Sequence, residues 1–403
     1  MILKLIFLLE ALVYLYLAFS TIYLFVFAFA GIFKIKKNTI KETRKRKMIV
    51  LIPGYREDEV IVDVAKEALK QDYGTENYDV AIIADGFLPE TIEKLSQINV
   101  KVFEVKLEFS TKSRALNAAL DQLDDSYDVA VILDADNIME TRFLTKVNEA
   151  FCAGYQIVQG HRIAKNMDTS FAILDAVSEE MNNHIFRKGH WVLGFSSSLI
   201  GSAMAFDYQY FKSTMREVKV VGGFDKELEV RLLKEKKKIV YLPDAYVYDE
   251  KVPNAKVFTK QRRRWISAQI HYFGKSFIPA FKELIFHGNI DLFNKALQFI
   301  LLPRILLISI LFIISLAFLI LAPASYFLPW IIIFVLCLLV FVLSIPGYFY
   351  NFRTLWAITR LPLGIFLTVL SVFRFKGGNK EYLHTKHTYN AFQIKHPWNR
   401  LRK

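Results

Sequence analysis

The chain has 403 residues, of which 53% are hydrophobic and 23% are charged, and its net charge is +13. This hydrophobic content excludes an intrinsically disordered protein, because disordered chains have too few apolar side chains to form a core. The apolar residues are also unevenly spread, since residues 305–352 contain no Asp, Glu, Lys or Arg. The sequence therefore predicts a membrane protein in which about residues 50–290 form one large water-exposed domain.

The excess of basic residues lies beside the apolar stretches. Eight lysines and arginines lie between Lys34 and Lys47, and a second basic cluster runs from Lys376 to Lys403. Basic residues next to membrane spans mark cytoplasmic ends, so the charge indicates membrane orientation, and we expect no nucleic-acid partner. The two cysteines, Cys152 and Cys337, cannot form a disulfide framework, which fits a reducing cytoplasm.

The first apolar run predicts an N-terminal transmembrane anchor over residues 1–33. The run is too long for a secretory signal sequence, and Leu12–Phe33 provides the roughly 20 residues that a spanning helix needs. Residues 34–47 are expected to form a basic cytoplasmic linker.

Two further apolar runs predict a membrane hairpin within residues 291–348. Ile305–Ala322 and Phe327–Ile345 are each just long enough to span a bilayer, and Pro323 begins the turn between them. The hairpin returns the chain to the side on which it entered the membrane.

The last apolar run, Leu363–Phe373, is too short to span. We therefore expect residues 349–403 to form an interfacial helix and a basic cytoplasmic tail. Three spans would make this a multi-pass protein of the cell (inner) membrane. They would place the domain at 48–290, which includes interfacial helices at its C-terminal end, on the cytoplasmic face.

Between residues 48 and 133, short runs rich in β-branched residues alternate with helical patterns. The runs predict strands at Met48–Pro53, Val80–Ala84, Val100–Val105 and Val129–Leu133. The intervening patterns predict helices at Glu59–Gln71, Pro89–Gln97 and Ser113–Leu123. This alternation is typical of an α/β domain with a parallel sheet, whose ligands bind beyond the carboxyl ends of the strands.

Acidic residues follow two of these predicted strands. Asp134 and Asp136 come directly after the fourth strand, where two carboxylates can bind a divalent cation together with substrate phosphates. Isolated pairs of this kind are often solvated loop acids, but the buried strand before them favours a metal site. Asp85 ends the second strand and is either a turn acid or an acceptor for a base or ribose.

Cationic residues occur in two patterns. Lys112 and Arg114 lie at the start of a predicted helix, where they either bind phosphate oxygens or form a solvated surface pair. Gln261–Trp265 contains three consecutive arginines beside a tryptophan. Such a run can bind a diphosphate and stack on a sugar ring, or it can lie on anionic lipid as a basic helix.

Together these motifs resemble the family 2 glycosyltransferases, a group of GT-A-fold enzymes that includes hyaluronan, chitin and cellulose synthases. The resemblance covers nearly the whole chain and implies a GT-A (Rossmann-like) mixed-sheet α/β domain inserted between transmembrane helices. It is carried by Pro53-Gly54-Tyr55-Arg56-Glu57, Asp85-Gly86, Lys112 with Ala115–Ala119, Asp134-Ala135-Asp136, Gly201–Phe206, Asp225 and Gln261–Trp265.

The resemblance implies a role for each matching residue. Nucleotide-binding residues would be Tyr55, Glu57 and Asp85 for the uridine, Lys112 for the diphosphate, Asp134 for the nucleotide, and Gln261, Arg264 and Trp265 for the diphosphate and acceptor mouth. Asp136 would bind the metal, Mg²⁺ or Mn²⁺.

The catalytic base is where the sequence departs from the family pattern. The family has Glu-Asp before a leucine-rich helix, whereas this chain has Phe224-Asp225, so the alignment places the base at Asp225. Glu227 is the alternative. On a helix these two acids are about 200° apart around the axis, so they cannot both face one acceptor.

The resemblance implies an inverting transferase that moves a sugar from a nucleotide diphosphate sugar, expected to be UDP-linked, to a growing polysaccharide or glycan. An α-linked donor would give a β-linked product at the inner membrane face. One alternative is transfer of a single sugar to a lipid or polyprenyl phosphate acceptor. Another alternative is a nucleotidyltransferase, although the glycine-rich phosphate loop of that class is missing near the first strand. A third is a non-catalytic membrane scaffold. The donor sugar and acceptor stay open.

Overall fold

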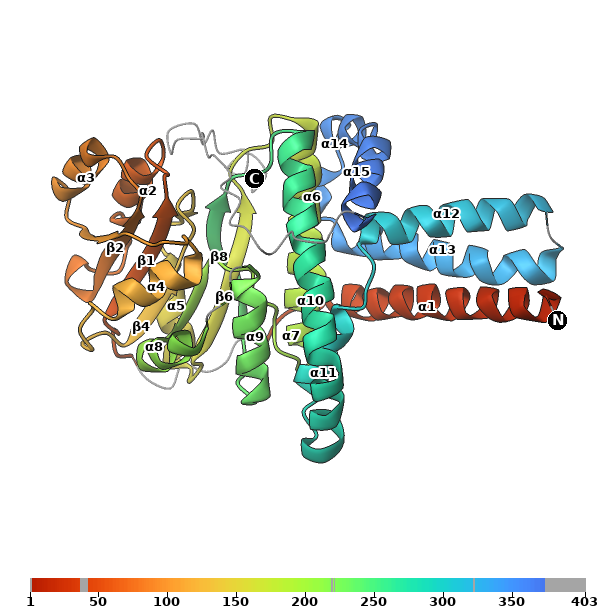
Figure 1. Cartoon of the computed structure of the whole chain (residues 1–403), viewed down its shortest axis with the longest axis horizontal. Coiled ribbons are helices and arrows are strands. Elements are labelled where there is room, and N and C mark those ends of the chain that lie inside the picture. The colour runs from red at the N-terminus through yellow and green to blue at the C-terminus, as the bar shows by residue number, and fades with distance from the viewer. Residues whose placement is uncertain (1, 37–42, 219, 221, 322, 374–403) are drawn as a thin grey trace.

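The protein consists of an α/β domain and a group of long apolar helices that extend from one side of it (Figure 1). The computed structural model describes residues 2–36, 43–218, 220, 222–321 and 323–373. The predicted basic tail at 374–403 and residues 37–42 of the predicted linker lie outside the described residues.

One sheet of eight strands forms the centre of the domain, in the order β3-β2-β1-β4-β7-β6-β8-β5. The strands β1, β2, β3 and β4 are parallel, whereas β7 is antiparallel to both β4 and β6. This mixed α/β sheet confirms the predicted fold class. The bounds are β1 Met48–Tyr55, β2 Tyr78–Asp85, β3 Lys101–Val105, β4 Val129–Ile132, β5 Ile138–Met139, β6 Ile157–Ala164, β7 Met204–Asp207 and β8 Val240–Asp249.

Helices cover both faces of this sheet, because alternate residues of the central strands point to opposite faces and both sets are apolar. Ile49 and Leu51 pack against one group of helices, and Val50 and Ile52 pack against the other. The first group includes α4 Lys112–Leu120, α8 Tyr208–Glu217 and α9 Phe224–Lys234, and the second includes α2 Ile61–Ala68, α3 Pro89–Ser96 and α5 Phe143–Cys152.

Three helices in the described part of the chain are long and apolar enough to cross a membrane: α1, α12 and α13. They contain most of each predicted span. Two shorter helices, α14 and α15, are bent by 47° at the break between them and together would count as a fourth candidate. The bounds are α1 Ile2–Ala30, α12 Arg304–Leu321, α13 Ala324–Ser344, α14 Phe352–Ile358 and α15 Leu361–Phe373.

Two helices join the domain to the apolar helices. The 33-residue α10, Ala255–His287, runs crosswise between the sheet domain and the ends of α1, α12 and α13 (Figure 1). The following α11, Ile290–Gln298, packs Leu292 and Ala296 into the core of the domain. The region predicted as the membrane hairpin therefore begins with a helix of the domain, and its long apolar helices begin only at Arg304.

The end of α1 packs closely against the segment that follows α6, Ser170–Asn182. That segment consists of the π-helical turn η2, Asn183–Gly189, and the short α7, His190–Val192. The ring of Phe27 stacks on His190 with 3.6 Å between ring centroids. Gly189 permits this approach, since a β-carbon there would lie 2.0 Å from the backbone oxygen of Phe27.

We predict that Gly189→Ala destabilises the protein by about 1–3 kcal/mol, because the added methyl group forces α1 away from η2. The measurement is thermal unfolding of the purified protein in detergent. Gly274→Ala is the matched control, because a β-carbon at this position of α10 meets no atom within 4 Å. Alanine is favoured over glycine inside a helix, so the control should retain or gain stability. Equal losses in the two variants would contradict this explanation.

Candidate active site

The carboxyl ends of β1, β2 and β4 border one cavity with a volume of about 500 Å³, which also touches the first turns of α4, α9 and α10. Every site residue predicted from the sequence lines this cavity. The set is Tyr55, Glu57, Asp85, Lys112, Asp134, Asp136, Asp225, Gln261, Arg264 and Trp265. Residues that are up to 210 positions apart in the chain are thus brought together.

Asp85 ends β2 as a buried carboxylate in this cavity. It accepts a hydrogen bond from the hydroxyl of Ser110, a residue that the sequence did not single out. Burial raises the pKa of Asp85, and the Ser110 hydroxyl and the Arg56 charge oppose that rise. A buried acceptor of this kind can bind the N–H groups of a base or the hydroxyls of a ribose.

Lys112 is the first residue of α4, which Thr111 caps by accepting from the backbone N–H of Arg114 at 3.2 Å. The Lys112 ammonium contacts the Asp134 carboxylate at 2.5 Å and donates to the carbonyl oxygen of Gly201 at 2.6 Å. Its position beside a helix N-terminus makes this end of the cavity favourable for an anion such as a diphosphate.

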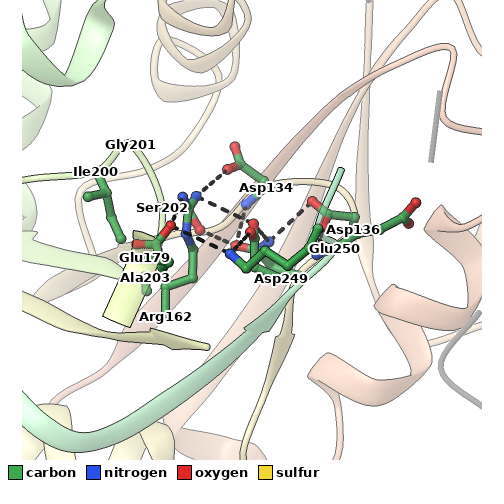
Figure 2. A network of polar contacts seen from close by, with 12 residues as sticks. Asp134, Asp136, Arg162, Glu179, Ile200, Gly201, Ser202, Ala203, Asp249 and Glu250 are labelled. Atoms are coloured by element: carbon green, nitrogen blue, oxygen red, sulfur yellow. Dashed lines mark hydrogen bonds and ion pairs between the residues drawn. The ribbon is translucent and has the colours of Figure 1, made fainter. Parts of the chain in front are cut away.

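Behind Asp134 lies a network of buried charges that only the structure identifies (Figure 2). Arg162 on β6 lies 2.8 Å from Glu179, 3.4 Å from Asp249 and 3.7 Å from Asp134. Burial lowers the pKa of Arg162, but these carboxylates raise it well above its ordinary value. Lys251 also pairs with Asp249, at 2.7 Å. The signals in the sequence were an arginine within an otherwise largely apolar strand and an acid at the end of β8.

Asp136 has the features of a metal ligand that shares its cation with a substrate. It is 2% exposed, and its carboxylate accepts from the backbone N–H of Glu250 at 2.8 Å and the side chain of Asn137 at 3.1 Å. Carboxylate oxygens are among the ligands that Mg²⁺ and Mn²⁺ prefer in proteins. Within the described residues no three His, Cys, Asp or Glu side chains form a complete metal site. The donor set therefore fits Mg²⁺ or Mn²⁺ whose remaining ligands are phosphate oxygens and water.

Asp225 lies in the first turn of α9 with its side chain 24% exposed, and it lines the cavity. Gly223 precedes this helix with a φ of +71°, a backbone conformation that favours glycine. Burial raises the pKa of Asp225, but the charges of Lys226 and Lys295 and the nearby backbone N–H groups bring it below its ordinary value. The carboxylate is therefore charged at neutral pH and able to accept a proton.

Glu227 has a different environment, although it is only two residues further along α9. It is 4% exposed and forms ion pairs with Arg231 at 2.9 Å and Lys275 at 2.7 Å. It is not among the residues that line the cavity. The packing of α9 thus separates the two acids, with Asp225 at the cavity and Glu227 held by two cations.

The first turns of α10 carry the arginine-rich run, and its members face different ways. Gln261, Arg264 and Trp265 line the cavity. Arg262 instead pairs with Asp175 at 3.2 Å, and its guanidinium lies 4.7 Å from the ring centroid of Trp265. The three consecutive arginines therefore do not act as one clamp, because neighbouring residues of a helix point in different directions.

Three solved structures are similar to this chain, and the first of them shares its fold. A mannosyltransferase from Pyrobaculum calidifontis in complex with GDP-Man and Mn²⁺ is 15% identical, with a TM-score of 0.57 over 91% of this chain and 98% of that chain. Glucosyl-3-phosphoglycerate synthase from Mycobacterium tuberculosis, in complex with Mn²⁺, UDP and glucosyl-3-phosphoglycerate, is 15% identical, with a TM-score of 0.39 over 58% of this chain and 84% of that chain. S. aureus TarS in complex with UDP is 16% identical, with a TM-score of 0.36 over 60% of this chain and 73% of that chain.

The family assignment comes from a match of the amino-acid sequence to a family model. No curated protein is significantly similar to the chain. The family model described as "Glycosyltransferase like family 2" matches residues 46–268, which is more than half of the chain and includes the strand ends and the start of α10 described above. The chain therefore belongs to glycosyltransferase family 2, with a GT-A-like domain.

Proposed function

We propose that the protein transfers one sugar from a nucleoside diphosphate sugar to an acceptor hydroxyl, with inversion at the anomeric carbon. The surroundings of Gly201 carry this proposal. Its carbonyl oxygen accepts from Lys112, and a β-carbon on this glycine would lie 3.8 Å from the β-carbon of Asp225. A cation for the departing diphosphate and a carboxylate for the incoming hydroxyl thus flank one point in the cavity.

The nucleotide would bind along the strand ends. Tyr55, Glu57 and Asp85 would hold the nucleoside, for which the motifs imply uridine, and Asp134 would bind the nucleotide beside Lys112. The GDP-Man in the Pyrobaculum calidifontis structure makes a guanosine donor the second candidate. Gln261, Arg264 and Trp265 lie across the cavity, and we assign them to the diphosphate and the acceptor mouth.

In the proposed step the acceptor oxygen attacks the anomeric carbon while Asp225 accepts its proton. The bond between that carbon and the diphosphate oxygen breaks, and the released negative charge is stabilised by Lys112 and Arg264. Mg²⁺ or Mn²⁺ held by Asp136 would supply further neutralisation of the diphosphate. A single displacement inverts the configuration, so an α-linked donor gives a β-linked product.

The membrane arrangement is part of the proposal. We place the spans in α1, α12 and α13 and the domain on the cytoplasmic face, as the basic residues at 34–47 indicate. The second half of α10 carries exposed apolar side chains at a helical spacing, so it would lie on the bilayer surface. These residues are Ile270, Ile278, Phe281 and Ile285.

The packing of the spans bears on the acceptor. Buried apolar residues fill the contacts among the described parts of α1, α12 and α13, including Leu17, Leu24, Leu307, Leu311 and Trp330. A hydrophilic glycan crossing a membrane needs polar side chains along its path. This packing favours transfer to a lipid-linked acceptor at the membrane face. The polymerising alternative is supported by the Gln261–Trp265 run.

Product length distinguishes these possibilities. The full-length protein, purified in detergent, is supplied with a glycolipid, which offers sugar hydroxyls, or with polyprenyl phosphate. The donor is UDP-glucose, UDP-N-acetylglucosamine or GDP-mannose, in Mg²⁺ and in Mn²⁺. We expect one sugar per acceptor, detected by mass spectrometry. A ladder of products would establish the polymerising alternative. If a sugar phosphate and a nucleoside triphosphate are the only productive substrates, the protein is a nucleotidyltransferase.

For the base, we predict that Asp225→Asn lowers the transfer rate by about 10²–10⁴-fold and leaves nucleotide affinity near normal, because only the proton acceptor is lost. Glu227→Gln should retain most of the rate and lose stability instead, since it removes the charge that pairs with Arg231 and Lys275. Initial rates and nucleotide titrations measure both effects. The reverse ranking of rates in two folded proteins would move the base to Glu227.

For the metal, we predict that Asp136→Asn abolishes the increase in nucleotide affinity that Mn²⁺ gives the wild-type protein, without changing affinity in EDTA. Asparagine retains an acceptor for the backbone N–H of Glu250, whereas Asp136→Ala would remove this hydrogen bond at a cost of about 1–3 kcal/mol. Titration calorimetry with UDP and GDP gives the affinities. An undiminished Mn²⁺ effect in the variant would exclude Asp136 as the ligand.

A further inference from the structure

A buried ion pair lies one helical turn beyond Asp225. Glu229 follows Asp225 by four positions on α9, and its Oε1 lies 2.8 Å from the ammonium of Lys295 on α11. The two side chains are only 3% and 9% exposed. The described residues offer no hydrogen-bond donor to the other oxygen of Glu229, so this pairing is the contact that compensates its charge.

Lys295 is itself held from several directions. Its ammonium donates to the hydroxyl of Ser198 and to Oε1 of Gln298, each at 3.1 Å. The Gln298 amide continues the chain of contacts to Nε2 of His190, also at 3.1 Å. Because Nδ1 of His190 faces the Ile185 carbonyl at 2.7 Å, it carries the proton and Nε2 accepts from Gln298.

The chain of contacts from Lys295 through Gln298 and His190 reaches α1, the first apolar helix. The His190 ring stacks on Phe27 of α1, and Tyr23 of α1 donates to the side chain of Asn294 at 2.7 Å. Burial lowers the pKa of His190 to about 3, so the imidazole is a neutral, permanent acceptor. The α11 helix is thus fixed between α1 and α9, and Lys295 forms its ion pair with the helix that carries Asp225.

The titratable groups around Asp225 come from three helices. Lys226 and Glu229 lie on α9 itself, Lys295 on α11 and Tyr272 on α10. Burial lowers the pKa of Lys295 and raises that of Glu229 above its ordinary value, so on acidification Glu229 takes up a proton before Asp225 does. The positive charge of Lys295 in turn lowers the pKa of Asp225, whereas burial raises the pKa of Tyr272 and keeps it neutral.

We propose that Lys295 is a positioning residue for the catalytic base: through its ion pair with Glu229 it fixes the first turns of α9 from behind and holds the Asp225 carboxylate at the cavity. This role rests on the proposed function, because it requires Asp225 to be the base. Its specific consequence is that the two partners of one ion pair affect the base differently. Loss of Lys295 removes a cation that is present throughout the pH range in which Asp225 titrates, whereas Glu229 is already protonated in that range.

The test compares the pH dependence of the transfer rate in the full-length protein, using whichever of UDP-glucose, UDP-N-acetylglucosamine and GDP-mannose the wild type accepts. The rate falls as acid protonates the base, so the midpoint of this acidic limb follows the pKa of Asp225. We expect Lys295→Met to move the midpoint to higher pH by about half a unit or more. Glu229→Gln should lower the rate and leave the midpoint in place, because glutamine resembles the protonated acid that is present along this limb. Lys295→Arg should restore the wild-type midpoint.

Lys275→Met is the matched control, because Lys275 also pairs with an acid of α9, Glu227, at 2.7 Å. Its midpoint should not move. If Lys295→Met fails to fold, Lys295→Gln takes its place, because its amide can still donate to Glu229 while the positive charge is lost, and the same shift is expected. If the wild type is active but the Lys295 variants lose rate while the midpoint stays in place, this inference is overturned and the proposed function is not. A folded wild type that binds nucleotide but transfers no sugar would instead overturn the proposed function.

Discussion

Parallel pairing of β1 with its two neighbours is the constraint on which the site depends. The register places Tyr55 beside Asp85 at the ends of β1 and β2, and Leu51 beside Ile132 two residues before Asp134. Because all three strands run in one direction, their polar ends meet at one edge of the sheet, where a ligand can contact several loops at once. Apolar residues on both faces of each strand hold this register, since a slip by one position would exchange the two faces.

The concentration of acids at that edge would be unfavourable without the buried cations behind it. Arg162, Lys112 and Lys251 each contact at least one carboxylate there, and Arg162 contacts three. A buried charge without a partner destabilises a protein by several kcal/mol, so these pairs are a condition for placing so many acids together. They also leave Asp134 and Asp136 in different environments. Asp134 is paired with two cations, whereas Asp136 accepts from N–H donors and can still bind a metal ion.

The second half of the cavity is formed by helices that also contact the apolar helices. The same α10 that brings Trp265 to the cavity continues along the ends of α1, α12 and α13, and α11 then packs beneath α9 (Figure 1). The acceptor side of the site and the proposed membrane spans are therefore parts of one packed unit. This arrangement suits an acceptor that arrives from the membrane, because the acid at the start of α9 is held by contacts that lead back to α1.

The sequence alone determined the features that depend on short-range patterns. Alternating apolar runs predicted β1, β2, β3 and β4, long uncharged runs predicted α1, α12 and α13, and the polar ends of the strands identified Asp85, Asp134 and Asp136. The antiparallel β7, the later strands and the charge network of Arg162 came only from the tertiary structure, since pairing between distant segments leaves no local pattern. The same holds for α9. Its sequence contains Asp225, Glu227 and Glu229 as similar acids of one helix, and only the packing of α10 and α11 around it decides that the first lines the cavity while the other two are neutralised by Lys275 and Lys295.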